Sequence, residues 1–371
     1  MKKMYEKVLV VSNMFPNKEF PSYGIFVKNF CDQLSELGIR YDVSALTKTK
    51  NRIIKLFKYG QFYIGTFFRC LFGGYDLTYI HYPSFSAKPV LIARKLRKFD
   101  IISNVHGTDV VPLKPEHQAM LGNTRKAFTY SRKIVVPSEY YKQLIIEKYK
   151  VEPRRVFVYP SAGVNDSIFF EYDMKKKEML KKEYGIDENT FVIGFVSRIN
   201  KAKGWDVFID ALEILEVPKN RKVKVFIVGS GEDDEALERR INSCSKELRE
   251  VIVRFPLVEQ NKLAEIYNLL DVFIFPTMSA SESLGLVAIE AMSCGCPVIA
   301  SNYAAPKYYV VDGKNGYKFN KGNSLELKET IDTYALFPKD KIASLKEGAL
   351  QTSKMYTRKE IEQVLNGLFS I

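Results

Sequence analysis

The sequence contains little that would mark a disulfide-bonded, zinc-binding or membrane-spanning protein. Its 371 residues include one tryptophan and five scattered cysteines, none of them in a CxxC pair. An odd number of scattered cysteines favours reduced thiols over disulfides or a zinc site. No run of about 18 apolar residues is present, so we expect no membrane-spanning helix. The apolar run at Val8–Val11 is too short for a signal peptide and is predicted to be a first buried strand.

Acidic residues are scarce in the first half of the chain. Residues 1–180 hold 30 Lys and Arg against 16 Asp and Glu, whereas residues 181–371 hold 26 against 27. The net charge of +13 therefore comes from the first half. A basic half of this kind indicates contact with an anionic surface. Because no nucleic-acid-binding motif accompanies it, we expect no nucleic acid partner and favour anionic lipid.

Short β-branched or aromatic segments alternate with amphipathic segments along the whole chain. Continuous apolar runs among them are typical of parallel strands buried on both faces. The alternation predicts βαβ units, and hence an α/β fold of two Rossmann-like, doubly wound domains facing across a cleft. The predicted strands are Val8–Ser12, Tyr41–Leu46, Leu77–His81, Ile101–Val105, Lys133–Pro137, Arg155–Tyr159, Phe191–Ser197, Lys224–Gly229, Val251–Phe255, Val272–Pro276 and Pro297–Ser301.

A lysine-rich, polar stretch indicates the domain boundary. We expect a first domain over residues 1–172, a linker with a surface helix over 173–188, and a second domain over 189–356. A final helix over 357–371 is expected to pack back on the first domain. Its apolar face holds Ile361, Val364, Leu365 and Leu368.

The segment Ser281–Ser301 carries the clearest functional signal. It follows a predicted strand, places Glu282 before a Ser-Leu-Gly-Leu turn, and continues into a helix that contains Glu290. Free backbone N–H groups at such a helix start suit a diphosphate. A carboxylate further along can accept hydrogen bonds from paired sugar hydroxyls, as in dinucleotide sites. Two isolated glutamates would indicate only a capped, solvated helix, but the whole string favours a sugar-nucleotide site.

This string resembles the Glu-x7-Glu motif of retaining GT-B glycosyltransferases of family 4, also called group 1. The resemblance covers essentially the whole chain and is more specific in the second half than in the first. Three positions, Lys307, Asn165 and Pro256, depart from residues that are common in the family. The other segments that are similar to the family, in order, are Pro21–Val27, Asn104–Asp109, Pro137–Glu139, Gly163–Phe169, Ser197–Gly204, Gly229–Gly231 and Val253–Pro276.

The resemblance implies that the first domain is the acceptor side and that the second domain binds the nucleotide sugar. It also implies a role for each residue of the second-half motif. Glu282 is expected to contact the transferred sugar and Glu290 the nucleotide ribose. The base is expected to stack near Val258. The backbone that is expected to cradle sugar hydroxyls and phosphate belongs to Ser283, Leu284, Gly285 and Leu286.

Two cations follow a predicted strand and are expected to act on the leaving group. Arg198 and Lys203 would stabilise the charge that grows on the departing nucleoside diphosphate, without a metal ion. The alternative is a pair of exposed surface cations. The acidic pair Asp233-Asp234 begins a helix and does not form a metal-binding loop. We therefore expect metal-independent chemistry and no cofactor.

The first half is expected to supply the rest of the site. Gly24 would let its loop approach the diphosphate closely, since a side chain would collide; the alternative is an ordinary turn glycine. His106, beside Gly107 at a strand end, would bond the donor sugar or organise the acceptor; the alternative is a packing histidine. The expected catalytic residues are His106, Glu282, Arg198 and Lys203.

The acceptor is expected to lie at a membrane. Lys48–Arg69 interleaves basic and aromatic residues, which suits either an interfacial helix on anionic lipid or an amphipathic helix on the sheet with its lysines in solvent. We favour the first, and hence peripheral contact with the inner face of an anionic membrane and a cytoplasmic protein.

The expected activity is the retaining transfer of a hexose from a UDP- or GDP-sugar to a lipid-linked or oligosaccharide acceptor in cell-surface polysaccharide assembly. One rival is a nucleotide-sugar 2-epimerase on the same architecture. Another is a non-catalytic scaffold of the same fold that binds lipid or nucleic acid. An NAD enzyme is disfavoured, because Gly229-Ser230-Gly231 lacks the third glycine of that fingerprint.

Overall fold

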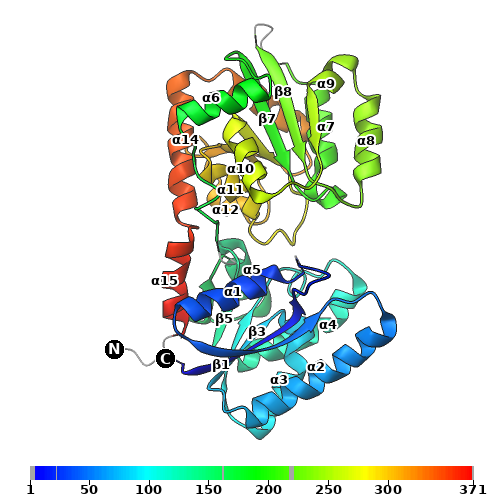
Figure 1. The fold of residues 1–371 in the computed structure, drawn as a ribbon, viewed down its shortest axis with the longest axis vertical. Helices are drawn as coiled ribbons and strands as arrows, with labels where there is room; N and C mark the ends of the chain where they lie inside the picture. The colour runs from blue at the N-terminus through cyan, green and yellow to red at the C-terminus, as the bar shows by residue number, and fades with distance from the viewer. Residues whose placement is uncertain (1–4, 22, 161–162, 217–220, 370–371) are drawn as a thin grey trace. The chain divides into compact units, whose positions relative to one another are not determined.

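The computed structural model describes residues 5–21, 23–160, 163–216 and 221–369. The chain packs as two units, one of residues 1–162 with 359–371, the other of residues 163–358. Each unit contains one six-stranded sheet whose neighbouring strands all run parallel, with helices packed against it (Figure 1). This is the predicted α/β arrangement of two Rossmann-like domains.

The sheet of the first unit has the strand order β2-β1-β3-β4-β5-β6. The chain therefore reverses its direction of travel across the sheet between β1 and β3, and ligands of such sheets bind outside the carboxyl strand ends at that point. Its strands are β1 (Lys7–Phe15), β2 (Arg40–Thr47), β3 (Leu77–His81), β4 (Asp100–Asn104), β5 (Lys133–Val136) and β6 (Val156–Val158). Its helices are α1 (Ile25–Glu36), α2 (Arg52–Phe72), α3 (Pro83–Leu96), α4 (Pro115–Tyr130) and α5 (Glu139–Tyr149).

The sheet of the second unit has the order β12-β11-β10-β7-β8-β9, so its reversal lies between β7 and β10. Its strands are β7 (Thr190–Val196), β8 (Lys222–Val228), β9 (Ile252–Phe255), β10 (Val272–Phe275), β11 (Val298–Ser301) and β12 (Gly316–Phe319). Its helices are α6 (Met174–Glu183), α7 (Trp205–Glu213), α8 (Asp234–Ser243), α9 (Lys246–Val251), α10 (Gln260–Leu269), α11 (Leu286–Ser293), α12 (Pro306–Tyr309), α13 (Ser324–Ala335) and α14 (Lys339–Lys354).

The central strands form because their residues are apolar on both faces. Every residue of β3 and of β7 is buried, as expected for parallel strands covered on both sides. Each of the eleven predicted strands overlaps a strand of the structure. The prediction missed β12, whose four residues pair with β11 beyond the last predicted strand.

The division between the units lies near residue 162, earlier than the predicted limit of 172. The reason is that residues 163–172 pack on the second unit. The Asn268 side chain accepts a hydrogen bond from Tyr172 N at 2.8 Å and donates one to Phe170 O at 3.0 Å. Helix α6, which was expected in a linker, packs against α10 of the same unit.

The last helix, α15 (Arg358–Phe369), packs on the first unit. It buries Ile361, Leu365 and Leu368 in the core that contains β1 and β3, and Lys133 Nζ donates to Leu368 O at 2.7 Å. Val364 was predicted on the same face but is 37% exposed. The predicted end at Ile371 lies outside the described residues.

Candidate functional site

A partly buried ion pair lies at the carboxyl ends of the central strands of the second unit. Lys203, in the loop after β7, donates from Nζ to Glu282 Oε2 at 2.6 Å. Thr277, directly after β10, donates from Oγ1 to the same oxygen at 3.1 Å. Glu282 is 8% exposed. Two of the predicted site residues are therefore in contact, at the strand reversal where α/β sheets bind ligands.

The two loops that carry this pair meet backbone to backbone. Gly204 has φ +73°, and a Cβ there would lie 2.0 Å from Pro276 O. Met278 N donates to Ala202 O at 2.9 Å across the same contact. Only glycine satisfies both the conformation and the space. The Lys-Gly step therefore brings Lys203 within reach of Glu282.

The start of α11 presents backbone N–H groups beside the pair. Gly285 has φ +75° at the N-cap, where no side chain caps the helix and no acidic residue occupies the first turn. Among the described residues, none accepts a hydrogen bond from the N–H groups of Ser283, Leu284 or Gly285. Unpaired N–H groups and the positive end of the helix dipole together suit an anion such as phosphate.

The second glutamate of the motif, Glu290, lies in the middle of α11. Glu290 is 7% exposed, and no ion pair to it is present among the described residues. Burial raises the pKa of its carboxyl to about 7, and the nearby Tyr267 hydroxyl lowers it by a smaller amount. A carboxyl so placed is suited to accept hydrogen bonds from ligand hydroxyls that replace lost water.

The remaining predicted site residues of the second unit are more exposed to solvent than Glu282 and Glu290. Arg198 comes two residues after β7 and is exposed, and its side chain has no hydrogen bond or ion pair to any residue that the structure describes. Leu286 begins α11 and is half-buried. Val258 is half-buried in the loop after β9, which is one of the two edge strands of this sheet. Arg198 thus lies at the reversal point as predicted, whereas Val258 follows a strand two positions away from β7.

The Gly229–Gly231 turn is explained by packing. A Cβ at Gly229 would lie 1.9 Å from Ser197 O, and one at Gly231 would lie 2.0 Å from Ile199 O. Both glycines therefore let this turn lie against the segment that carries Arg198. The turn supports the loop after β7, and this role requires no dinucleotide.

In the first unit, His106 lies at the carboxyl end of β4, in a cluster of aromatic rings. Its ring centroid is 4.5 Å from that of Phe26 and 4.8 Å from that of Tyr82. Its Nε2 is 2.9 Å from His81 Nδ1. The backbone of this loop is held by Asp109, whose carboxylate accepts from Gly107 N at 2.8 Å and His106 N at 3.1 Å. Burial raises the pKa of Asp109 to about 7.

The local backbone of the first unit requires a glycine at position 24. Gly24 has φ +77° at the start of α1, and a Cβ there would lie 2.6 Å from the carbonyl carbon of Met14 and 2.7 Å from Phe15 N. The loop after β1 therefore folds back tightly on the end of that strand. This requirement is separate from the predicted approach of a diphosphate.

Three residues that shape these sites, His81, Asp109 and Thr277, were given no role from the sequence, although Asp109 lies in the family-like segment Asn104–Asp109. His81 was the last residue of a predicted strand, and Thr277 followed another. Polar residues at the carboxyl ends of parallel strands are the expected positions for ligand contacts, so a positional rule would have found both. Asp109 acts through the backbone, and no side-chain motif identifies such a role.

Across residues 5–21, 23–160, 163–216 and 221–369, no three or more His, Cys, Asp or Glu side chains are grouped so as to hold a metal ion. The five cysteines are free and buried.

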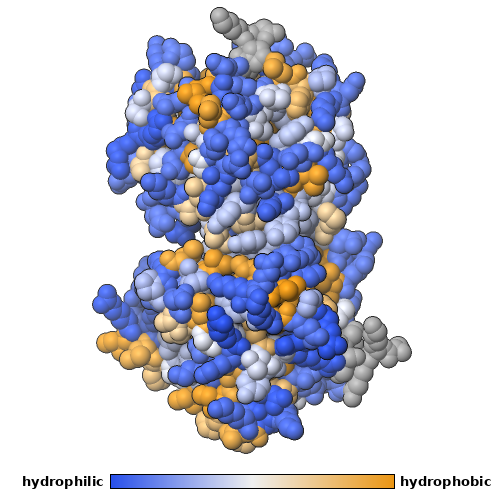
Figure 2. Space-filling model, turned by 180° about the vertical axis from the view of Figure 1, so that it is seen from behind, coloured by the Kyte–Doolittle hydropathy of each residue, from blue (hydrophilic) through white to orange (hydrophobic). Residues whose placement is uncertain are grey.

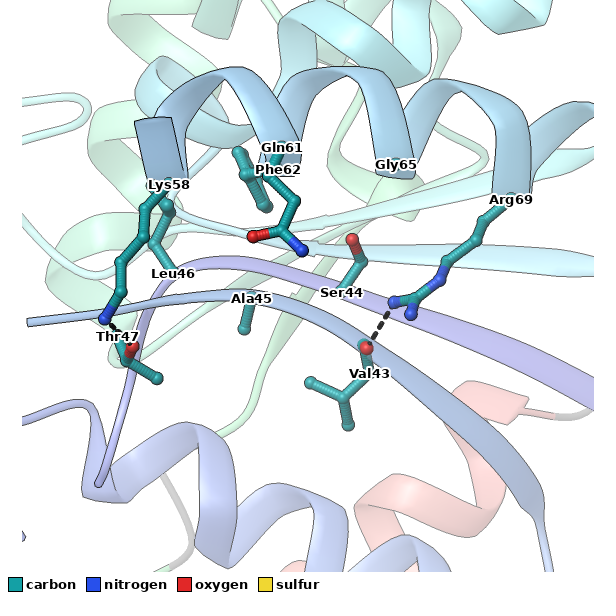
Figure 3. A pocket seen from close by; sticks show the side chains of 10 residues that line it. All are labelled: Val43, Ser44, Ala45, Leu46, Thr47, Lys58, Gln61, Phe62, Gly65 and Arg69. Carbon is teal, nitrogen blue, oxygen red and sulfur yellow. Dashed lines mark hydrogen bonds between the residues drawn. The ribbon is translucent and has the colours of Figure 1, made fainter. Parts of the chain in front are cut away.

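A cavity of about 320 Å³ lies between helix α2 and the carboxyl-terminal half of edge strand β2 (Figure 3). Lys58 Nζ donates to Thr47 Oγ1 at 2.7 Å and Arg69 donates to Val43 O at 2.7 Å, so both side chains reach from the helix to the strand. Gly65 faces the gap between them. Two cations of the predicted membrane-binding stretch are therefore turned toward the sheet.

The outer face of α2 is apolar and uncovered. We call this face the apolar stripe; its residues are Ile53, Leu56, Phe57, Ile64, Phe68 and Phe72, which are 52% to 81% exposed. Helix α3 packs beside α2 (Figure 1) and adds Leu96, which is 70% exposed. Figure 2 shows apolar surface on this part of the first unit. Within the described part of the chain, no helix is both long and apolar enough to cross a bilayer.

Two parallel, doubly wound sheets with these sites at their reversal points define a GT-B fold. The family described as Glycosyl transferases group 1 matches residues 176–349, and the family described as Glycosyltransferase Family 4 matches residues 23–162. Together the two matches cover most of both units. The chain belongs to the group 1 glycosyltransferases of family 4.

Individual relatives are distant. D-inositol 3-phosphate glycosyltransferase of Corynebacterium aurimucosum is 29% identical over 280 residues, which are 72% of this chain and 65% of that protein. Capsular polysaccharide biosynthesis glycosyltransferase CapM of Staphylococcus aureus is 28% identical over 199 residues, which are 54% of this chain and 51% of that protein. The matches thus span between half and two thirds of the length of these curated relatives.

The same fold occurs in a solved structure. Anabaena Alr3699/HepE, crystallised with UDP and glucose, aligns with a TM-score of 0.71 over 99% of this chain and 100% of that chain. The two sequences are 19% identical. At that identity the likeness establishes the fold alone.

Proposed function

We propose that this protein transfers a sugar from a nucleotide-sugar donor to a hydroxyl group of an acceptor. The observation that carries the proposal is the Lys203–Glu282 pair beside the open start of α11, at the strand reversal of the second unit. An anion site next to a carboxylate suits a sugar linked to a diphosphate. Family membership supports the same activity, and Alr3699/HepE has been solved with UDP-glucose.

In the proposed reaction the bond between the anomeric carbon and the diphosphate oxygen breaks, and a bond from that carbon to the acceptor oxygen forms. The acceptor proton passes to the leaving phosphate. Arg198 and Lys203 stabilise the negative charge that develops on this phosphate. Because these cations supply that stabilisation, we propose that no metal ion is required. Retention of configuration is proposed on the Glu-x7-Glu resemblance of Glu282 and Glu290.

Donor turnover tests the activity. The purified full chain is incubated with a panel of UDP- and GDP-sugars, and release of nucleoside diphosphate is measured with and without oligosaccharide acceptors. Loss of a charged group from the site is expected to lower kcat by about 100-fold or more, so Glu282→Gln and Arg198→Ala should each do so. Glu329→Gln and Arg239→Ala, exposed residues on α13 and α8, are the matched controls and should keep full activity.

Two results would contradict the proposal. Turnover that survives Glu282→Gln and Arg198→Ala together would show that these residues are not the site. Activity that disappears in EDTA and returns with Mg²⁺ or Mn²⁺ would contradict metal independence. The anomeric configuration of the product, read by NMR, decides whether the transfer is retaining.

We further propose that the acceptor is lipid-linked and that the first unit binds anionic membrane through α2. The apolar stripe supports this, because six large apolar side chains on one helix face remain uncovered in the structure. The basic excess of residues 1–180 supplies attraction to anionic headgroups. Since Lys58 and Arg69 reach back to β2, the stripe, more than these two cations, makes the contact.

Vesicle sedimentation tests this surface. The full chain is mixed with vesicles of phosphatidylcholine and phosphatidylglycerol in a ratio of about 7:3, and the double variant Leu56→Ser/Phe57→Ser is compared with Leu257→Ser. Leu257 is 84% exposed in the second unit and serves as the control. Each buried CH₂ adds about 0.8 kcal/mol to membrane binding, so the double variant should bind at least about tenfold more weakly. Equal binding by all three proteins would overturn the role of α2.

A further inference from the structure

The ring of His81 lies directly behind that of His106 in the first unit. His81 is the last residue of β3 and is 1% exposed, whereas His106 is half-buried. The two rings stack with their centroids 5.1 Å apart and an angle of 25° between planes. A hydrogen bond of 2.9 Å joins His81 Nδ1 to His106 Nε2.

A hydrogen bond between two neutral imidazoles couples their tautomers. Burial lowers the pKa of His81 well below its usual range and that of His106 to about 3, so both rings are neutral near pH 7. One nitrogen of the pair must then donate and the other must accept. The position of the proton on His81 therefore decides which nitrogen of His106 carries one.

The surroundings of His81 favour one of the two arrangements. Its Nε2 is buried and has no hydrogen-bond partner in the described chain, and the rings of Phe30 and Tyr79 lie 4.9 and 5.0 Å away, centroid to centroid. A buried N–H without an acceptor is rarer in proteins than an under-used acceptor. The proton of His81 therefore belongs on Nδ1, where His106 Nε2 accepts it.

The second ring nitrogen of His106, Nδ1, is less enclosed than His81 Nε2. His106 Nδ1 makes no hydrogen bond within the described residues and is not among their buried, unpartnered atoms. It therefore keeps contact with solvent at the carboxyl end of β4. With Nε2 acting as the acceptor, this Nδ1 carries the remaining proton.

We propose that His81 is a positioning residue that holds His106 as the Nδ1–H tautomer, so that His106 offers a ligand oxygen a hydrogen-bond donor and not a base. This inference rests on the proposed function for its ligand, whose sugar hydroxyl or phosphate oxygens would accept the bond. The arrangement assigns deprotonation of the acceptor to another group. Near pH 7, His106 then contributes binding and orientation without exchanging a proton.

NMR of the ring nitrogens tests the tautomer directly. The chain has only three histidines, so ¹⁵N-histidine labelling yields six ring signals, and the variants His81→Phe and His117→Phe assign them. In the ligand-free protein, His106 should show a protonated Nδ1 and an unprotonated Nε2. A protonated Nε2 on His106, or a doubly protonated ring at pH 7, would overturn the proposal. His117, on α4, is the internal reference.

Kinetics test the positioning role. The amide of His81→Asn can still donate to His106 Nε2, whereas His81→Phe fills the pocket without a donor. Loss of the partner that orients a ligand-binding histidine costs about 10- to 100-fold in metal sites. We expect kcat/KM to fall about tenfold or more in His81→Phe and to recover in His81→Asn. If His81 served packing alone, the order would be reversed, because Phe suits an aromatic pocket better than Asn.

The two measurements separate this inference from the proposed function. A chain that turns over no nucleotide sugar would refute the proposed activity, and the role of His106 toward a sugar would fall with it. The ring spectrum, recorded without any ligand, would still decide whether His81 controls the tautomer of His106.

Discussion

At the scale of single residues, the second-unit site holds two glutamates in different environments. Glu282 accepts hydrogen bonds from Lys203 and Thr277. Glu290 is equally buried but has no cation beside it among the described residues, and burial raises the pKa of its carboxyl to about 7. The two carboxyls of one motif are therefore suited to different partners, the first to a charged group and the second to neutral hydroxyls.

The raised pKa of Glu290 predicts a pH-dependent stability. Because the folded pKa of about 7 lies above the ordinary 4.5, the folded state binds the proton more tightly than the unfolded state does. The free energy of unfolding should therefore fall as pH rises from 4.5 to 7, by up to about 3 kcal/mol from this group. The variant Glu290→Gln lacks this loss. In urea unfolding at several pH values, the free energy of unfolding of the variant should rise relative to that of the native protein as pH rises. A difference between the two proteins that does not change with pH would contradict the raised pKa of Glu290.

The glycine at the start of α11 predicts a loss of stability on substitution. In Gly285→Ala, the new Cβ would lie 2.6 Å from the Phe275 ring, at a φ of +75°. Strain of this kind costs about 1–3 kcal/mol, and urea unfolding should register it. Gly122→Ala is the control, because Gly122 lies inside α4 with open space around it; there alanine should stabilise the protein by about 0.5–1 kcal/mol. Equal effects of the two substitutions would contradict this reasoning.

At the scale of elements, α2 presents more than one apolar face. Helix α2 buries Phe62, Thr66 and Cys70 against the sheet and leaves the apolar stripe on its outer side. Its sequence is apolar around most of its circumference, so periodicity alone does not distinguish its core face from its exposed face. That is why the sequence left open whether this helix packs on the sheet or meets a membrane.

The packing of α15 predicts that substitutions at two neighbouring residues, Val364 and Leu365, differ in their effect on stability. Leu365 is fully buried in the core of the first unit, whereas Val364 is 37% exposed. Truncation of a buried leucine costs about 2–5 kcal/mol, so Leu365→Ala should lower the free energy of unfolding of the first unit by that amount. Val364→Ala should change it by less than about 1 kcal/mol. Chemical denaturation followed by fluorescence measures both, and similar losses would show that α15 is docked differently.

At the scale of the whole molecule, charge is distributed unevenly along the chain. The net charge of +13 comes from residues 1–180, and the rest of the chain is close to neutral. Most of these residues, up to residue 162, belong to the unit whose α2 carries the apolar stripe. Membrane binding would therefore combine an electrostatic attraction that acts at a distance with a short-range apolar contact.

This combination predicts a partial salt dependence. Raising the salt from about 0.1 to 1 M shortens the Debye length from about 10 to 3 Å. Affinity for anionic vesicles should then fall by about tenfold or more, toward the weak binding that we expect with pure phosphatidylcholine vesicles. Sedimentation over a salt series measures it. Affinity that does not change with salt would show that the basic excess has no part in binding.

The fold was largely predictable, because parallel strands covered on both faces appear as short apolar runs that a pattern detects without tertiary information. Strand β12, a four-residue edge strand of mixed character, has no such run and was missed. The boundary near residue 162 was also misplaced. It depends on Asn268, which binds the backbone of residues 170 and 172 from about a hundred positions further along the chain.

The candidate site, like the fold, was predictable from the sequence only in part. The sequence by itself determined the family, the fold and the order of Arg198, Lys203, Glu282 and Glu290 along the chain, because a motif is a local pattern with a local geometry. Only the tertiary structure decided that Lys203 pairs with Glu282, that Gly24 and Gly204 are required by neighbouring backbone, and that His81 lies behind His106. These contacts join segments that are distant in the chain, and they form only when parallel strands bring their carboxyl ends to one edge of a sheet.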